Sequence, residues 1–75
     1  MNIDWQMLAL NIRRHRPLTL VSLALGKDTD YLGRLSRRAV EEPKFSDGLA
    51  LLDLHLDMCG LEKHLKLTGV KKNGR

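Results

Sequence analysis

Apolar residues recur at intervals of three and four along the first segment of the chain, which is the spacing of an amphipathic helix. On a helical wheel of residues 4–16, Met7 and Leu10 lie off the apolar face. Pro17 ends this segment, because proline disfavours helical geometry at the preceding residue and cannot donate to the helical hydrogen-bond ladder. The apolar face, which we expect to be buried, consists of Trp5, Leu8, Ala9 and Ile12.

Two short helical segments follow, with a glycine between them. The first covers residues 18–25 (LTLVSLAL), and Thr19 is its candidate N-cap. Gly26 stands where a helix commonly ends in a left-handed residue. The second covers residues 28–40, and Asp28 is its natural N-cap. Its compact apolar arc consists of Tyr31, Leu32, Leu35 and Ala39.

A longer segment over residues 47–59 has Ser46 as its candidate N-cap and Gly60 at its end, and a weaker helix over residues 61–67 follows it. Within it, residues 52–58 alternate strictly between apolar and polar side chains, which is the pattern of a strand. However, this stretch contains no Val, Ile, Thr or aromatic residue, and aspartate is depleted in strands. We therefore expect a helix.

As a helix, residues 47–59 carry two apolar stripes, which Asp53 and Asp57 separate on one side and His55 on the other. One stripe consists of Leu49, Leu52, Leu56 and Cys59, and the other of Ala50, Leu51, Leu54 and Met58. If one stripe covers the core, the second is left exposed on a monomer, and a contiguous exposed apolar patch usually marks an interface. Either a homodimer forms there or residues 61–67 fold over the second stripe. For the homodimer we expect an interface of Leu51, Leu54 and Met58.

Size and composition support a helical binding module. With 75 residues, the chain has room for one domain and too little interior for a deep catalytic cleft. Leucine dominates the 43% of hydrophobic residues, and only 4% of all residues are aromatic, which favours helices. We expect an all-α fold of four to five short helices over residues 1–68, followed by a disordered basic tail over residues 69–75.

Charge, cysteine content and hydrophobicity indicate the class of partner and the cellular compartment. The formal net charge of +4 suits a polyanionic partner. A single cysteine rules out an internal disulfide and fits a reducing cytoplasm. No apolar run approaches the roughly 20 residues of a membrane span, and the first residues lack the pattern of a secretion signal. We expect an intracellular, soluble protein that does not enter membranes.

Residues 18–37, LTLVSLALGKDTDYLGRLSR, resemble the helix-turn-helix of lambda-repressor-like and Cro-like phage regulators. That pattern has a small residue at its fifth position and glycine at its ninth, which Ser22 and Gly26 match. The small residue lets the two helices cross closely, and the glycine adopts a conformation that residues with a Cβ avoid. The similarity extends to about Asp57. The four apolar positions of the pattern are matched by Val21, Leu25, Leu32 and Leu35.

The resemblance implies a phage or prophage repressor that binds double-stranded DNA in a bacterial cytoplasm, with its third helix in the major groove. Arg34 and Arg37 are the first candidates for base contact, because a guanidinium pairs bidentately with guanine. The other candidates for base contact are Thr29, Asp30 and Gly33. Candidates for phosphate contact are Arg13, Arg14, Arg16, Lys27, Arg38 and Lys44.

A second interpretation keeps the helix-turn-helix framework but gives it a protein partner, as in an antirepressor or an inhibitor of a host regulator. Asp28 and Asp30 favour it, because they put negative charge near the expected phosphates. The unburied Met7 and Leu10 favour it as well. Arg34 and Arg37 on one face favour DNA.

Residues able to carry out chemistry are sparse. His55 and Cys59 share a helix face near His64, but a fourth metal ligand is not evident. The same residues lack the orienting group and the oxyanion feature of a cysteine–histidine catalytic pair. We therefore expect no catalysis, no metal ion and no cofactor.

Overall fold

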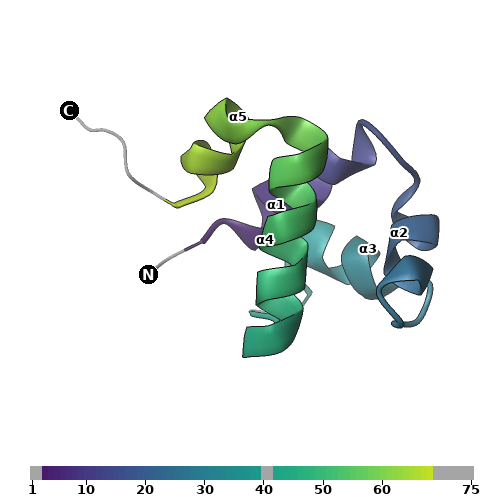
Figure 1. Cartoon of the computed structure of the whole chain (residues 1–75). Helices are drawn as coiled ribbons and strands as arrows, with labels where there is room; N and C mark the ends of the chain where they lie inside the picture. The colour runs from purple at the N-terminus through teal and green to yellow at the C-terminus, as the bar shows by residue number, and fades with distance from the viewer. Residues whose placement is uncertain (1–2, 40–41, 69–75) are drawn as a thin grey trace.

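Five short α-helices and a terminal 3₁₀ turn make up residues 3–39 and 42–68, the part of the chain that the computed structural model describes (Figure 1). The predicted all-α fold is thereby confirmed, and residues 52–58 are helical. No helix in this part has the length and apolar content to cross a bilayer. The tail predicted over residues 69–75 lies outside the described residues. The elements are α1 (Trp5–Arg13), α2 (Leu18–Ala24), α3 (Tyr31–Ser36), α4 (Phe45–Cys59), α5 (Leu61–Leu65) and η1 (Lys66–Thr68).

Helix α1 is the central element, because α2, α3, α4 and η1 all pack against it. The Asp4 carboxylate caps its start by accepting a hydrogen bond from the backbone N–H of Met7 at 3.0 Å. Of the predicted buried face, Leu8, Ala9 and Ile12 are fully buried, whereas Trp5 is half-buried. The helix ends at Arg13, three residues before the predicted end. Its buried face therefore organises the core of the protein.

Ser22 joins α2 to α3. Its side chain is fully buried, and its hydroxyl accepts a hydrogen bond from the backbone N–H of Leu32 at 3.0 Å. Leu32 is the second residue of α3, so Ser22 caps α3 from the neighbouring helix. By contrast, the predicted N-cap Thr19 is wrong, because α2 begins after Pro17 without a side-chain cap. A small hydroxyl residue at position 22 thus serves both close packing and capping.

Ser22→Ala is expected to lower the free energy of unfolding by about 1–3 kcal/mol, because it leaves the buried N–H of Leu32 without its partner. Urea denaturation followed by circular dichroism measures this cost. The matched control is Ser46→Ala in the exposed first turn of α4, for which a change within about 0.5 kcal/mol is expected. Equal costs at the two positions would contradict the capping role of Ser22.

Helix α4 lies across α1 (Figure 1) and begins at Phe45, one residue before the predicted N-cap Ser46. Gly48 is buried at its start, where an added Cβ would stand 3.2 Å from the Trp5 ring. Glycine therefore lets the indole pack against the first turn of α4. Gly60 ends the helix with a φ of 91°, as predicted.

The predicted homodimer interface is wrong at Leu51, which is fully buried in the core of its own chain. Leu54 and Met58 are half-buried and pack against the same core. The exposed apolar residues of α4 include instead Leu49 and Leu56, whose exposed fractions are 53% and 39%. Helix α4 is rotated about its own axis relative to the prediction. The prediction placed His55 at the boundary between the two stripes, whereas this polar residue faces the core.

Three polar side chains form a chain of contacts through this core. His55 is fully buried, and its Nε2 lies 3.0 Å from Nδ2 of Asn11 on α1. On the other side, Nδ1 of His55 lies 3.3 Å from Nδ1 of His64 on α5. Among the described residues, no group of three or more His, Cys, Asp and Glu side chains is placed to hold a metal ion. Through these contacts, Asn11, His55 and His64 connect α1, α4 and α5.

Acidification is expected to destabilise the protein. Burial, reinforced by the neighbouring His64, His15 and Lys63, holds the pKa of His55 below its usual value. Below about pH 6.5 the unfolded chain takes up a proton that the folded chain resists, so the free energy of unfolding falls as pH falls. Urea denaturation at pH 7.5 and pH 5.5 measures this effect. The pH dependence should shrink strongly in His55→Gln and only slightly in His15→Gln, because burial and not His15 is the main cause of the lowered pKa; equal dependence in both variants would contradict the assignment.

Candidate nucleic-acid interface

Helices α2 and α3 pack against each other and against α1, which places them as a helix-turn-helix (Figure 1). Gly26 adopts the predicted left-handed conformation, with a φ of 78°. Its N–H donates to the Leu23 carbonyl at 2.9 Å, and the N–H of Lys27 donates to the Ser22 carbonyl at 3.0 Å. These two bonds form a Schellman motif, which ends α2 and turns the chain toward α3. Of the four apolar positions in the pattern, Val21, Leu32 and Leu35 are buried and Leu25 is half-buried.

Helix α3 is much shorter than the predicted segment 28–40. Asp28 is not its N-cap but closes the preceding turn, where its Oδ1 accepts a hydrogen bond from the N–H of Asp30 at 3.0 Å. The helix ends in a second Schellman motif, in which Arg38 takes the left-handed position with a φ of 58°. Ala39, predicted in the buried arc, is consequently exposed beyond the helix. Without a glycine at position 38, the pattern did not indicate this end.

Gln6 holds the end of α3 against α1. Its Nε2 donates a hydrogen bond to the Ser36 carbonyl at 3.0 Å, and its Oε1 accepts one from Nε of Arg38 at 2.6 Å. The predicted phosphate contact Arg38 is thus tied to α1 through Gln6. Sequence reasoning missed Gln6, because a polar residue between apolar positions of a helix has the pattern of an ordinary solvated residue.

The predicted base-contacting arginines lie together on one side of α3, but each is paired with an aspartate. Nη2 of Arg34 lies 3.1 Å from Oδ2 of Asp28, and Nη1 lies 3.8 Å from Oδ2 of Asp30. Nη2 of Arg37 lies 3.0 Å from the same oxygen of Asp30. The hydrogen bond from Arg34 and the backbone N–H of Asp30 both lower the pKa of the Asp28 carboxyl. The four side chains form a line of alternating charge with no net charge.

Gly33 gives these charges room. An added Cβ at this position would stand 2.6 Å from Oδ1 of Asp30 and 3.2 Å from Nη1 of Arg37. The pair between Asp30 and Arg37 therefore runs directly over Gly33, where any side chain would displace it. Thr29, the remaining predicted base contact, is exposed in the turn before α3.

Among the predicted phosphate contacts, Lys27 is the most constrained. Its Nζ lies 2.8 Å from Oδ2 of Asp47 at the start of α4 and 5.5 Å from the centre of the Tyr31 ring. The hydrogen bond to Asp47 raises the pKa of Lys27, so this ammonium ion stays charged while it holds the turn to α4. The side chains of the other four candidates are exposed, and these are Arg13, Arg14, Arg16 and Lys44.

The geometry of α3 allows two chemical uses. Each guanidinium can exchange its carboxylate partner for guanine O6 and N7, since both partners offer two acceptors in one plane. The same line of charges can also pair with complementary charges on a protein. No family model matches the chain, and neither a curated protein nor a solved structure is similar enough to count as a match.

Proposed function

We propose that the protein is a sequence-specific regulator of transcription that binds double-stranded DNA, a repressor of the phage or prophage type. The observation that carries the proposal is the placement of Arg34 and Arg37 on one exposed side of α3. This short helix follows a glycine turn and is held at its start by Ser22 and at its end by Gln6. A rigidly held helix with two outward guanidiniums suits recognition of base edges in a major groove.

Binding would proceed by exchange of partners on α3. On approach to DNA, Arg34 and Arg37 leave Asp28 and Asp30 and pair with guanine, while a freed carboxylate can accept from cytosine N4. Exposed ion pairs contribute little to folding, so their loss costs the protein little. The net charge of +4 supplies the general attraction to phosphates. Because the arginines are paired with aspartates in the free protein, binding would then favour DNA sequences whose bases offer the arginines equivalent hydrogen bonds.

A homodimer is part of the proposal, because two copies would place two α3 helices on successive turns of the groove. The exposed residues Leu49 and Leu56 on α4, and Phe45 with an exposed fraction of 82%, support an interface in place of the predicted one. Sedimentation at several protein concentrations tests this part separately.

Selection from a random duplex library at low salt tests the DNA proposal, with fluorescence anisotropy on the selected duplex. We expect Kd to rise steeply with salt, and Arg34→Ala and Arg37→Ala each to weaken binding by roughly 5- to 150-fold. The matched control is Lys63→Ala on α5, which removes the same charge away from α3. If the unchanged protein enriches no sequence and binds no duplex at low salt, the proposal is wrong.

One observation favours a protein partner instead. The group of four charged side chains on α3 has no net charge, because Asp28 and Asp30 neutralise Arg34 and Arg37, and such a mixed group suits pairing with a protein. An antirepressor or an inhibitor of a host regulator would bind its protein partner through this surface and would have no affinity for any duplex. The same low-salt titration therefore separates the two candidates.

A further inference from the structure

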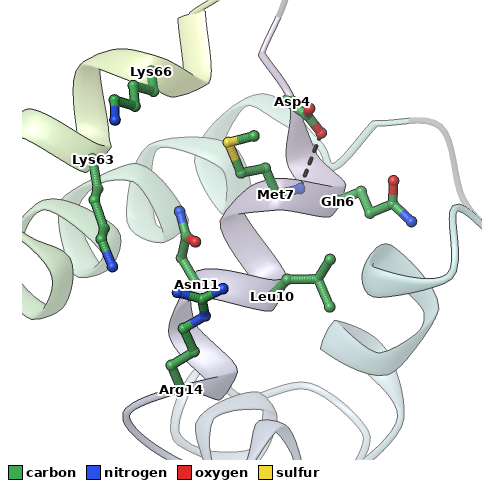
Figure 2. Close-up of a pocket in the computed structure, with 8 residues that line it drawn as sticks. All are labelled: Asp4, Gln6, Met7, Leu10, Asn11, Arg14, Lys63 and Lys66. Carbon is green, nitrogen blue, oxygen red and sulfur yellow. Dashed lines mark hydrogen bonds between the residues drawn. The ribbon is translucent and has the colours of Figure 1, made fainter.

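A groove of about 370 Å³ runs along the side of α1 that faces away from the core (Figure 2). Met7 and Leu10, one helical turn apart, supply apolar side chains to it, and each has an exposed fraction of 39%. They are exposed because Leu8, Ala9 and Ile12 occupy the opposite, buried face of α1. The groove therefore presents an apolar patch that the fold itself does not cover.

The walls of the groove are held in place by contacts outside it. Helix α5 packs against α4, and the fully buried Leu67 of η1 anchors the segment after α5. The carbonyl of Leu67 accepts a hydrogen bond from the backbone N–H of Asp4 at 2.9 Å, which joins η1 to the start of α1. Asn11, which also lines the groove, is held by His55. A preformed surface of this kind loses little entropy when a partner binds.

The charge of the groove is positive. Arg14 projects into it from the C-cap position directly after α1, and Lys63 and Lys66 approach from α5 and η1 (Figure 2). Within residues 3–39 and 42–68, none of these three cations forms an ion pair with a carboxylate. Asp4 is the one carboxylate among the described lining residues, and it is engaged as the N-cap of α1. The arginines of α3, in contrast, are neutralised by aspartates.

We propose that this groove binds an acidic amphipathic helix of a partner protein. Apolar side chains spaced three or four apart on such a helix would cover Met7 and Leu10, and methionine adapts readily to different partners. Carboxylates beside them would reach Arg14, Lys63 and Lys66. Nucleic acid fits less well, because phosphates would leave the apolar patch exposed to water. A membrane fits less well, because a flat bilayer surface does not enter a groove. The proposal is independent of the DNA-binding function.

The test uses the full chain and a fluorescent 18-residue peptide with leucine at every third or fourth position and glutamate elsewhere. A second peptide carries lysine in place of each glutamate. We expect anisotropy to show saturable binding of the acidic peptide only. Leu10→Glu and Lys63→Glu should each weaken it by roughly tenfold or more. Each has a control with the same charge change at another exposed position, Leu23→Glu on α2 and Lys44→Glu before α4, for which we expect a change within about twofold.

Several outcomes would overturn the proposal. Equal binding of the lysine peptide would show that the charge of the groove does not select the partner. Unchanged binding by Leu10→Glu would show that the partner does not contact the apolar patch. If vesicles containing phosphatidylglycerol bind the chain and the acidic peptide does not, the groove faces a membrane. If random-sequence duplex displaces the peptide and Lys63→Glu abolishes duplex binding, it is a nucleic-acid site. Arg34→Ala should leave peptide binding unchanged, so failure of the DNA proposal would be seen separately. Far-UV circular dichroism of each variant verifies its fold.

Discussion

Leu51→Ala is expected to lower the free energy of unfolding by about 2–5 kcal/mol, because it removes a fully buried side chain and leaves a cavity in the core. A domain of this size has a total stability of about 4–11 kcal/mol, at roughly 0.05–0.15 kcal/mol per residue. The variant should therefore lose a large share of this stability. Urea denaturation at low temperature, followed by far-UV circular dichroism, measures the loss.

Leu49→Ala is the matched control when it is measured at a protein concentration at which sedimentation shows a monomer, since it makes the same change two residues earlier in α4 at a side chain with an exposed fraction of 53%. Its expected cost is within about 1 kcal/mol. The comparison tests how α4 is rotated against α1. If Leu49 were the costlier position, or if the cost at Leu51 varied with protein concentration as at a dimer interface, the packing described above would be wrong.

Asp28→Asn combined with Asp30→Asn is expected to strengthen binding to random-sequence duplex by roughly tenfold or more. The two changes remove negative charge beside the expected phosphates and release Arg34 and Arg37 from their carboxylate partners. Affinity for a selected sequence should rise less, because there the bases already replace the carboxylates. The ratio of the two affinities, measured by anisotropy over a range of salt concentrations, should fall.

The matched control is Asp53→Asn combined with Asp57→Asn, which makes the same change in net charge on the exposed side of α4. A general charge effect would give the same gain in both double variants. A gain confined to Asp28 and Asp30 would support the exchange of partners on α3. If neither variant binds duplex at low salt, the line of charges on α3 belongs to a protein interface.

Local pattern was sufficient for the all-α fold and for several of the helix ends. The spacing of Leu8, Ala9 and Ile12 predicted the buried face of α1, because that spacing is a property of one helix alone. Gly26 and Gly60 predicted the ends of α2 and α4, since a left-handed residue is needed there and glycine adopts it without strain. Each of these features depends on the backbone within one or two turns.

The candidate site depended on contacts between residues distant in sequence, which no local pattern contains. Gln6 reaches Ser36 and Arg38 only because α1 and α3 lie side by side, and this contact accompanies the early end of α3. The pairs of Arg34 and Arg37 with aspartates, in contrast, join residues only four to seven positions apart, and the pair between Asp30 and Arg37 lies over Gly33.

Periodicity and backbone preference act locally, and they were enough to predict short helices, a glycine turn and a leucine-rich core. The rotation of α4 and the groove beside α1 arise instead from packing between helices. His55 has the pattern of a polar boundary residue, yet its burial is possible because Asn11 and His64 supply polar contacts from two other helices. Which polar residue is buried depends on the polar partners that other helices bring to it, and the local sequence pattern does not identify these partners.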